Sequence, residues 1–285
     1  MPPTSPLFVP ATRPDLMPKA LAGDADAVIV DLEDAVAADA KEEARAALAS
    51  LLPREPSIPV AVRVNGPNTP EFARDLAALE PLLDRVAFVV APMVSASDEV
   101  TRVDRALAGA ESAAGVDHRT PLVPLVETAE GVLDARELAG AAERVLTLAF
   151  GPADLAVELG AEPTGPHGGF TTARSLLVLA CRAARVAPPL DGPHLDLSDT
   201  TGLAAAAAGA RGLGFGGKLT IHPSQVGVVR EQFTPSAADL AWAERVDRAF
   251  TEAEAQRSAS IRLDDGTFVD RPVALRARSL LERAV

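Results

Sequence analysis

Short apolar runs rich in β-branched residues alternate with alanine-rich amphipathic stretches along most of this 285-residue chain. Runs of this kind are typical of parallel strands that helices cover. Strands are expected within residues 7–11, 27–34, 59–65, 85–93, 121–128, 144–154, 188–194 and 215–223. Helices are expected between them, for example over 39–52, 70–83 and 171–186. The alternation therefore predicts an α/β fold built on a parallel sheet.

The number of strand–helix units narrows this prediction. Eight units in about 230 residues match a (β/α)8 TIM barrel, which we expect over residues 1–234. A doubly wound open sheet is the structural alternative. It is less favoured because no G-x-G-x-x-G turn follows the first strand.

The pattern changes in residues 235–285, a C-terminal appendage. Its first stretch has a helical apolar face, and a short hairpin is expected around Asp265-Gly266, a dipeptide favoured in two-residue turns. A last helix follows, with Pro272 near its start. Roughly 50 residues rarely bury enough core to fold alone. We therefore expect the appendage to pack on the barrel or, more readily, on a neighbouring subunit.

Charge and cysteine content restrict the partners and the compartment. The net charge is −13, with a pI near 4.8, and such a field repels nucleic acid and anionic membranes. No apolar run approaches the roughly 20 residues of a membrane span, and the first residues do not resemble a signal peptide. Cys181 is the only cysteine, which suits a reducing compartment. We expect a cytoplasmic protein with no nucleic-acid or membrane partner.

Polar side chains follow nearly every predicted strand. They are Asp31, Glu33, Asp34, Arg63, Asn65, Glu127, Thr128, Asp154, Asp191 and His222. The carboxyl ends of parallel strands gather at one face, where barrel enzymes carry their active sites. The alternative is that the strands simply end in polar loops.

Glu127 and Asp154 end the fifth and sixth predicted strands, so we expect them to be neighbours. Two carboxylates with few other protein ligands are the usual protein contribution to a Mg²⁺ site, which waters and substrate oxygens complete. No H-x-x-x-H or C-x-x-C spacing favours zinc. The alternative role of each carboxylate is a helix N-cap, because helical patterns follow both.

Arg63 ends a buried strand, where its guanidinium can grip a carboxylate or enolate oxygen with two donors. Its alternative role is a buried ion pair with Asp31, Glu33 or Asp34. The FGPAD segment that ends in Asp154 offers backbone N–H groups near a helix start, which favour a bound carboxylate.

Several motifs together resemble those of a known family. The opening LFVPATRPDLMPKAL, AVIVDLEDAVAADAKEEAR, VRVNG, LVETAEGV, LAFGPADLAVELG, LTIHPSQVGVVREQFTPS and GTFVDRPV span nearly the whole chain. The chain resembles the citrate lyase β-subunit-like branch of the HpcH/HpaI aldolase superfamily, the CoA-ester lyases.

The resemblance implies a TIM barrel whose Mg²⁺, with Mn²⁺ as a substitute, is held by Glu127 and Asp154. It implies that Arg63 is catalytic and that Asp270 reaches a neighbouring subunit's site as an acid/base, in a homo-oligomer that is a trimer or a multiple of one. From the residues alone, Asp270 has an alternative role as the N-cap of the last helix. The implied substrate-binding residues are Arg63, Glu127, Gly151, Pro152 and Ala153, and Asp31, Glu33 and Asp34 support the metal's water shell.

The implied activity is Mg²⁺-dependent cleavage, or the reverse condensation, of a 3-hydroxyacyl-CoA such as malyl-, citramalyl-, citryl- or hydroxymethylglutaryl-CoA. Two alternatives stay open: an aldolase that acts on a free hydroxy-keto acid, and a subunit of a multi-protein lyase complex. The chain departs from the family at two positions. Pro92-Met93 replaces the usual Pro-Lys, so one positive charge is missing from the rim of the site, and no basic residue precedes the first strand. Both departures concern the positions that usually contact the CoA phosphates.

Overall fold

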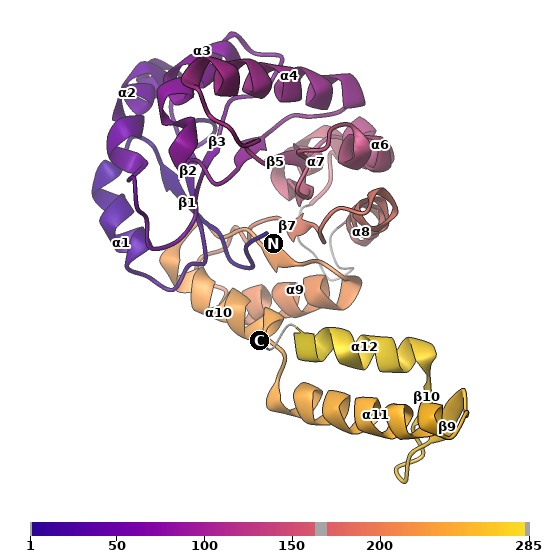
Figure 1. The fold of residues 1–285 in the computed structure, drawn as a ribbon. Helices are drawn as coiled ribbons and strands as arrows, with labels where there is room; N and C mark the ends of the chain where they lie inside the picture. Colours follow the sequence, from indigo (N-terminus) through magenta and orange to yellow (C-terminus); the bar gives the residue numbers. More distant parts are fainter. Residues whose placement is uncertain (1, 163–169, 283–285) are drawn as a thin grey trace. The chain divides into compact units, whose positions relative to one another are not determined.

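Eight parallel strands form one curled sheet, in the order β1 to β8, in the computed structural model, which describes residues 2–162 and 170–282 (Figure 1). The strands are β1 (Leu7–Pro10), β2 (Val28–Asp31), β3 (Val60–Arg63), β4 (Val89–Ala91), β5 (Leu122–Val126), β6 (Ala149–Phe150), β7 (Leu190–Asp191) and β8 (Gly217–Lys218). Each lies within a run that the sequence predicts as a strand. The predicted α/β fold with a parallel sheet is confirmed.

The register runs without interruption from the first strand to the last. Leu7 of β1 pairs with Val28 of β2, and Asp191 of β7 pairs with Lys218 of β8. Leu7 also forms an isolated parallel bridge with Thr220, two residues beyond β8, and the Phe8 N–H donates to the Thr220 carbonyl at 2.9 Å. The first strand therefore lies beside the segment that follows the last.

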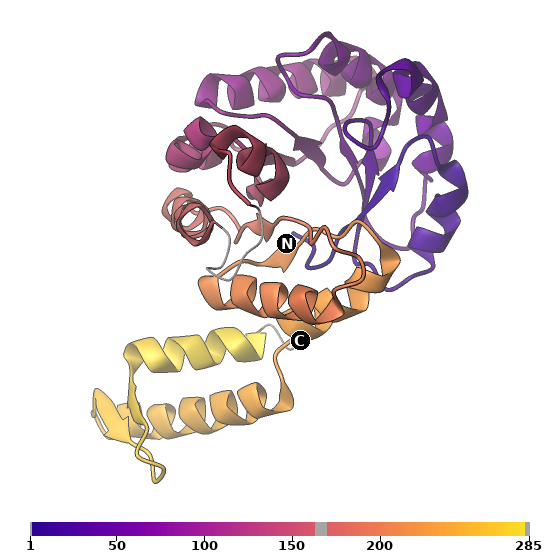
Figure 2. The same ribbon diagram turned by 180° about the vertical axis from the view of Figure 1, so that it is seen from behind.

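Helices connect the strands and lie on the outer side of the sheet, as Figures 1 and 2 show. The α-helices of this part are α1 (Met17–Leu21), α2 (Lys41–Leu51), α3 (Pro70–Leu79), α4 (Ser97–Ala114), α5 (Ala129–Leu133), α6 (Ala135–Gly140), α7 (Pro152–Leu159), α8 (Thr171–Ala184), α9 (Thr200–Leu213) and α10 (Pro223–Phe233). Short 3-10 helices are η1 (Pro14–Leu16), η2 (Ala38–Ala40) and η3 (Glu80–Arg85).

The inner side of the sheet is filled by side chains at alternate strand positions. This buried cluster comprises Ala27, Ile29, Ala61, Phe88, Val90, Val123, Leu125, Ala149, Leu190 and Leu219. Side chains two residues apart on a strand share a face. The same face therefore continues from Ile29 to Asp31, from Ala61 to Arg63 and from Leu125 to Glu127. Strand periodicity thus brings three polar side chains to the inner side at the carboxyl ends.

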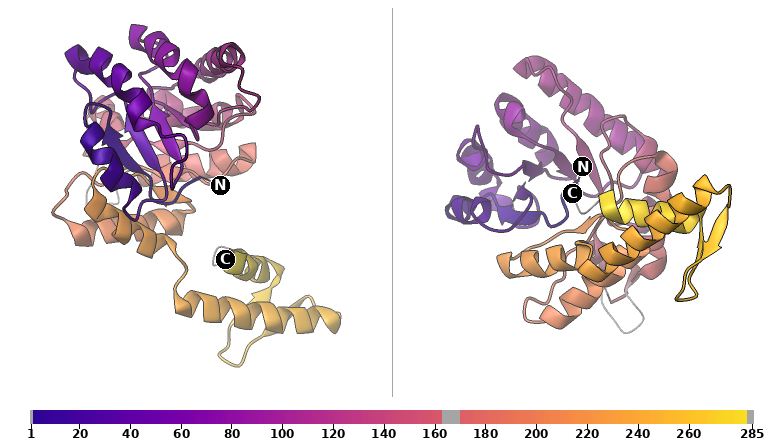
Figure 3. Two further views of the ribbon diagram at one scale, coloured as in Figure 1. Left: turned by 60° about the vertical axis from the view of Figure 1, so that its left-hand side comes forward. Right: turned by 60° about the horizontal axis from the view of Figure 1, so that its bottom comes forward.

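The chain forms two compact units, within which most residue–residue contacts lie: Met1–Arg230 and Glu231–Val285. The second unit holds α11 (Ala237–Ala255), β9 (Ser260–Arg262), β10 (Phe268–Asp270) and α12 (Arg271–Glu282). In Figures 1 and 3 its two helices lie side by side, with the hairpin at one end. Its own core includes Val246, Phe250, Val269 and Ala277.

The hairpin in this unit forms where the sequence predicts it, but its turn differs. Strands β9 and β10 pair antiparallel, with Arg262 opposite Phe268. The Gly266 N–H donates to the Leu263 carbonyl, and Gly266 alone of the Asp265-Gly266 pair has a positive φ, of 85°. A two-residue type I′ turn needs positive φ at both positions, whereas a longer loop needs one left-handed glycine. The predicted two-residue turn is therefore wrong.

Within residues 2–162 and 170–282, none of the helices combines the length and the apolar character that crossing a bilayer requires.

Candidate active site

A cavity of about 360 Å³ lies at the carboxyl ends of the strands in the first unit. Most of the residues predicted from the sequence line it. These are Asp31, Asp34, Arg63, Glu127, Gly151, Pro152, Ala153 and Asp154. Glu33 does not line the cavity but contacts Arg63, and Asp270 belongs to the second unit.

Glu127 follows β5 and is 3% exposed. Its Oε1 accepts a hydrogen bond of 2.6 Å from the Met93 N–H. Met93 has a φ of 54°, a left-handed conformation that is uncommon for a non-glycine residue and typical of functional sites. On its other side the carboxylate lies against Gly151, where an added Cβ would come within 2.5 Å of Glu127 Oε2. Backbone from two different loops therefore fixes this carboxylate.

Asp154 is an exposed residue in the first turn of α7. The residue that caps this helix is Gly151, and the residue that caps α5 is Thr128, whose hydroxyl accepts a hydrogen bond from the Gly131 N–H. The alternative that Glu127 and Asp154 are helix N-caps is therefore wrong. Both carboxylates are left for a role in the cavity that they line.

The pKa of Glu127 reflects first its burial and then the negative charge around it. Burial raises the pKa of Glu127 to about 8, although the Met93 N–H opposes the shift. The charges of Asp154 and Glu33 add to the rise. A cation close to this carboxylate would offset both the burial and the repulsion.

Arg63 ends β3, and its guanidinium is held by the acidic loop that follows β2. Its Nε and one terminal nitrogen donate to the two oxygens of Asp31 at 2.7 and 2.6 Å. Its other terminal nitrogen lies 2.9 Å from Glu33 Oε2 and 3.5 Å from Asp34 Oδ2. The Phe8 ring covers it, with its centroid 4.8 Å from Cζ. The alternative that Arg63 forms a buried ion pair is confirmed, with all three acids as partners.

Burial would by itself lower the pKa of Arg63, but the hydrogen bonds and charge of Asp31 outweigh it and raise that pKa. Arg63 is therefore a permanent cation. Burial also raises the pKa of Glu33 to about 7, although the charge of Arg63 opposes that shift. The acidic loop places three carboxyl groups, those of Asp31, Glu33 and Asp34, around the single guanidinium of Arg63.

Five of the predicted polar strand ends do not line the cavity: Glu33, Asn65, Thr128, Asp191 and His222. Asp191 follows Leu190 of the inner cluster, so its side chain turns to the other face of the sheet. There it binds Arg174 through two hydrogen bonds of 3.0 and 2.9 Å and Lys218 through one of 2.6 Å. His222 is exposed and contacts Ser224. For Asp191 and His222 the polar-loop alternative holds.

Apolar residues that the sequence did not single out complete the cavity wall. Phe8, Phe150, Leu195 and Ile221 line it. The last two are 47% and 38% exposed, which is unusual for large apolar side chains. Phe8 packs against the inner cluster from β1. It lies within the quoted LFVPATRPDLMPKAL motif, but only strand periodicity could have indicated that its side chain faces the cavity.

The side chains present fit a hard divalent cation. Across the described part of the chain, no cluster of three or more His, Cys, Asp or Glu side chains could hold a metal ion. Mg²⁺, however, is usually held by one or two carboxylates and completes its shell with water and substrate. The cavity lining offers four carboxylates against the single cation of Arg63. This donor set is all oxygen and its net charge is negative.

Fold and cavity together define an α/β enzyme with an acidic site at the carboxyl ends of a parallel sheet. The model of the HpcH/HpaI aldolase/citrate lyase family matches residues 4–223. The chain belongs to this family, and it is an enzyme of the carbon–carbon lyase type.

Named relatives agree with this assignment. The L-malyl-CoA/beta-methylmalyl-CoA lyase of Rhodobacter capsulatus is 33% identical over 287 residues, which cover 93% of this chain and 89% of the relative. The citrate lyase subunit beta-like protein of Mycobacterium tuberculosis is 39% identical over 286 residues, covering 98% and 94%. The crystal structure of CitE from the same organism, in complex with magnesium, acetoacetate and coenzyme A, superposes with a TM-score of 0.81. It is 34% identical, and the match covers 99% of this chain and 97% of that one.

Proposed function

We propose that this chain cleaves a 3-hydroxyacyl-CoA into an acyl-CoA and a keto acid, or catalyses the reverse condensation, with Mg²⁺ held by Glu127 and Asp154. Malyl-, citramalyl-, citryl- and hydroxymethylglutaryl-CoA are the candidate substrates. One observation carries the proposal: the buried Glu127 carboxylate and the Arg63 guanidinium line one cavity with Asp154. The relatives support it, since two are named for malyl-CoA or citrate lyases and CitE was crystallised with magnesium, acetoacetate and coenzyme A.

In the proposed cleavage the substrate hydroxyl loses its proton and the carbon–carbon bond breaks. The keto acid departs, and the electron pair of the bond passes to the thioester enolate, which then takes up a proton to give the acyl-CoA. Mg²⁺, when bound, supplies positive charge that stabilises the oxygens on which negative charge develops. Preorganised charge of this kind is usually the largest single contribution to catalysis.

The chain's own residues bind and orient the substrate. Two of the five N–H donors of Arg63 are engaged by Asp31, and a terminal nitrogen also forms an ion pair with Glu33. The remaining donors are available to a carbonyl or carboxylate oxygen in the cavity. Gly151, Pro152 and Ala153 begin α7, where the helix dipole favours a bound carboxylate. Asp31, Glu33 and Asp34 are placed to accept hydrogen bonds from waters around the metal.

The architecture that we propose is a closed (β/α)8 barrel. The parallel bridge between Leu7 and Thr220 supports closure, because it joins β1 to the segment after β8. A closed barrel has no free sheet edge. Residues 1–234 form this catalytic domain in the proposal.

Residues 235–285 are proposed to pack on a neighbouring subunit of a cytoplasmic homo-oligomer, a trimer or a multiple of one. Phe268 and Leu275 of this segment are 61% and 52% exposed, and a partner surface would cover them. Asp270 would act on the neighbour's substrate as an acid/base. Its Oδ1 accepts a hydrogen bond from the Val273 N–H at 3.2 Å, so it also caps α12. The second oxygen is then available for chemistry.

A second candidate function is aldol cleavage of a free hydroxy-keto acid. Met93 favours it, because it is 46% exposed where the family usually has a lysine, and Arg63 is the only cation among the cavity-lining residues within 2–162 and 170–282. A third is a subunit that works only within a lyase complex, and one relative is named a citrate lyase subunit beta-like protein.

One experiment separates the three. The purified chain is supplied with Mg²⁺ and a panel of hydroxyacyl-CoA thioesters and the matching free acids, and acyl-CoA and keto acid are measured by mass spectrometry. Turnover of a thioester by the chain alone supports the proposal. Turnover of free acids only supports the second candidate, and no turnover of either supports the third.

A further inference from the structure

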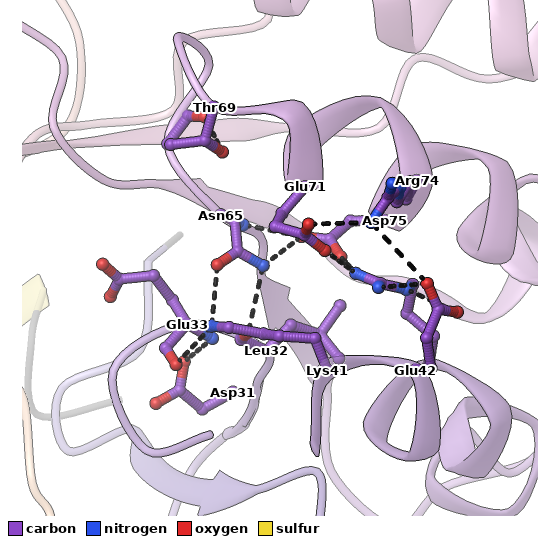
Figure 4. A network of polar contacts seen from close by, with 12 residues as sticks. Asp31, Leu32, Glu33, Lys41, Glu42, Asn65, Thr69, Glu71, Arg74 and Asp75 are labelled. Carbon is purple, nitrogen blue, oxygen red and sulfur yellow. Dashed lines mark hydrogen bonds and ion pairs between the residues drawn. The ribbon is translucent and has the colours of Figure 1, made fainter. Parts of the chain in front are cut away.

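Lys41 occupies an unusual position for a lysine. The chain has only three lysines, at positions 19, 41 and 218. Lys41 begins α2, and its Nζ donates to the Leu32 carbonyl at 2.7 Å, the Glu33 carbonyl at 2.8 Å and Asn65 Oδ1 at 2.8 Å (Figure 4). An ammonium has three donors, so all of them are used, and all three acceptors are uncharged oxygens.

Asn65 is itself held in one orientation. Its side-chain amide donates to the Leu32 carbonyl at 3.0 Å and to Asp75 Oδ2 at 2.6 Å, and its backbone N–H donates to the same oxygen at 2.7 Å. Asp75 is fully buried, and its other oxygen binds Arg45 at 2.9 Å. With both amide hydrogens engaged in this way, Asn65 must present its oxygen to Lys41. Figure 4 shows the acceptors converging on the lysine.

The loop that Lys41 holds is the one that carries the acidic residues. On one side of the loop, Asp31 accepts hydrogen bonds from the Glu33 and Ala35 N–H groups at 2.9 and 3.2 Å, and it holds Arg63. On the other side, the Leu32 and Glu33 carbonyls point to Lys41. The turn is therefore held by hydrogen bonds on both sides. Without Lys41, the Leu32 carbonyl keeps only the Asn65 amide and the Glu33 carbonyl keeps only the Val36 N–H, so the loop that carries Asp31 and Glu33 is held less firmly.

We infer that Lys41 is a positioning residue for the proposed lyase reaction, and that its ammonium fixes the loop so that Asp31 and Glu33 keep the Arg63 guanidinium oriented toward the substrate. The inference rests on the proposed function. It also explains why this arginine-rich chain has a lysine here. A compact ammonium directs three donors at converging acceptors, whereas the planar fork of arginine cannot.

The test uses three variants in the full-length chain. Lys41→Met removes the charge and keeps the stem, and Lys41→Arg keeps the charge and changes the geometry. Lys41→Cys can be alkylated to an aminoethyl cysteine, which restores an ammonium of nearly the same reach. The native Cys181 is 1% exposed, and wild type treated with the same reagent controls for its modification.

Three quantities are measured: kcat and KM on the best thioester, Mg²⁺ affinity by calorimetry, and hydrogen exchange of the Glu33 and Ala35 amides. We expect Lys41→Met and Lys41→Arg to lose about 10- to 100-fold in kcat, the usual effect of removing a group that orients a site. KM should change less than about threefold, and both amides should exchange faster. Aminoethylation of the cysteine variant should restore kcat and slow the exchange again.

Lys218→Met is the matched control. Lys218 is also buried, and its Nζ donates to Asp191 Oδ2 and the Gly192 carbonyl, each at 2.6 Å. This variant should lower the unfolding midpoint without faster exchange at Glu33 and Ala35.

The inference is overturned if Lys41→Arg, which keeps the buried charge and should fold, retains wild-type kcat and exchange. It is also overturned if aminoethylation restores the unfolding midpoint but not kcat. If wild type neither binds Mg²⁺ nor turns over any thioester, the proposed function fails instead. The exchange comparison then still decides whether Lys41 fixes the loop.

Discussion

The Glu127 side chain packs closely against Gly151: a Cβ at position 151 would come within 2.5 Å of both Cβ and Oε2 of Glu127. Side-chain Cβ atoms essentially never come so close to another heavy atom, so any other residue at position 151 must displace the Glu127 carboxylate.

Gly151→Ala should reduce Mg²⁺ affinity and activity by at least about tenfold, because an orienting contact is lost. Overpacking should also cost about 1–3 kcal/mol of stability. Gly109→Ala is the control, since nothing lies within 4 Å of a Cβ there and Gly109 lies inside α4. It should stabilise the protein by about 0.5–1 kcal/mol. Calorimetric titration and urea unfolding check both variants, and unchanged Mg²⁺ binding in Gly151→Ala would contradict the prediction.

Glu127→Gln and Asp154→Asn should each sharply reduce Mg²⁺ affinity and activity while the fold survives, because an amide oxygen is a weaker ligand than a carboxylate for a hard cation. Asp34→Asn is the comparison: it removes a carboxylate from the same cavity lining but from a residue not proposed as a ligand. Calorimetry decides the assignment. Wild-type Mg²⁺ binding in both ligand variants would rule it out.

Arg63→Lys should lose roughly 2–4 kcal/mol of transition-state stabilisation, the scale of one preorganised donor. An ammonium cannot keep two hydrogen bonds to Asp31 and still offer a second pair of donors to the substrate. Steady-state kinetics measure the loss. Activity within about threefold of wild type, less than 1 kcal/mol, would mean that Arg63 serves only as an ion-pair partner of the acidic loop.

The buried pair of Glu111 and Arg144 predicts a pH dependence of stability. Burial alone would raise the pKa of Glu111, but the hydrogen bonds and charge of Arg144 outweigh it and hold that pKa below its ordinary value of 4.5. A depressed pKa in the folded state stabilises the protein above the unfolded-state pKa, and this contribution is lost as pH falls through the folded-state pKa.

Glu111→Gln should therefore cost about 1.5–3 kcal/mol at pH 7, the value of a hydrogen bond to a charged group. The difference from wild type should shrink below the pH at which Glu111 protonates in the unfolded chain. Urea unfolding at a series of pH values from 7 to 3 measures it. A difference that stays constant over the whole series would show that the charge of Glu111 contributes nothing.

Asp270 gives a prediction about assembly. If it acts across subunits, inactive Asp270→Asn chains mixed with inactive Glu127→Gln chains should regain activity, because some sites then combine the intact half of each. The chains must be co-expressed or refolded together so that they exchange. Mixed oligomers that are verified by mass and remain inactive would exclude a role for Asp270 in a neighbour's site.

The α/β fold with a parallel sheet could be predicted because hydrophobic periodicity is local. Each strand lies in an apolar run that the sequence displays, and the two-residue period explains why Arg63 and Glu127 face inward. The same period explains why the prediction for Asp191 is wrong. A polar residue at a strand end can lie on either face of the sheet, and only its position in the two-residue period decides which. A run of two strand residues, as in β7, is too short to show it.

The remaining parts of the site depend on contacts between distant residues. Lys41 and Asn65 are 24 positions apart, and Met93 and Glu127 are 34 apart. No pattern within one element indicates such pairs, because they arise only when the strands are assembled. The left-handed conformation of Met93 is equally hidden, since methionine has no preference for it.

The hydrogen bond from Met93 to Glu127 is donated by a main-chain N–H, so it does not depend directly on the side chain at position 93. A residue that has an N–H and tolerates the left-handed backbone of position 93 preserves the donor, so such a side chain can replace methionine without releasing the carboxylate. The Met93 side chain itself is 46% exposed and is not among the residues that line the cavity. The charge and size of the residue at position 93 can therefore change while the hydrogen bond that holds Glu127 is kept.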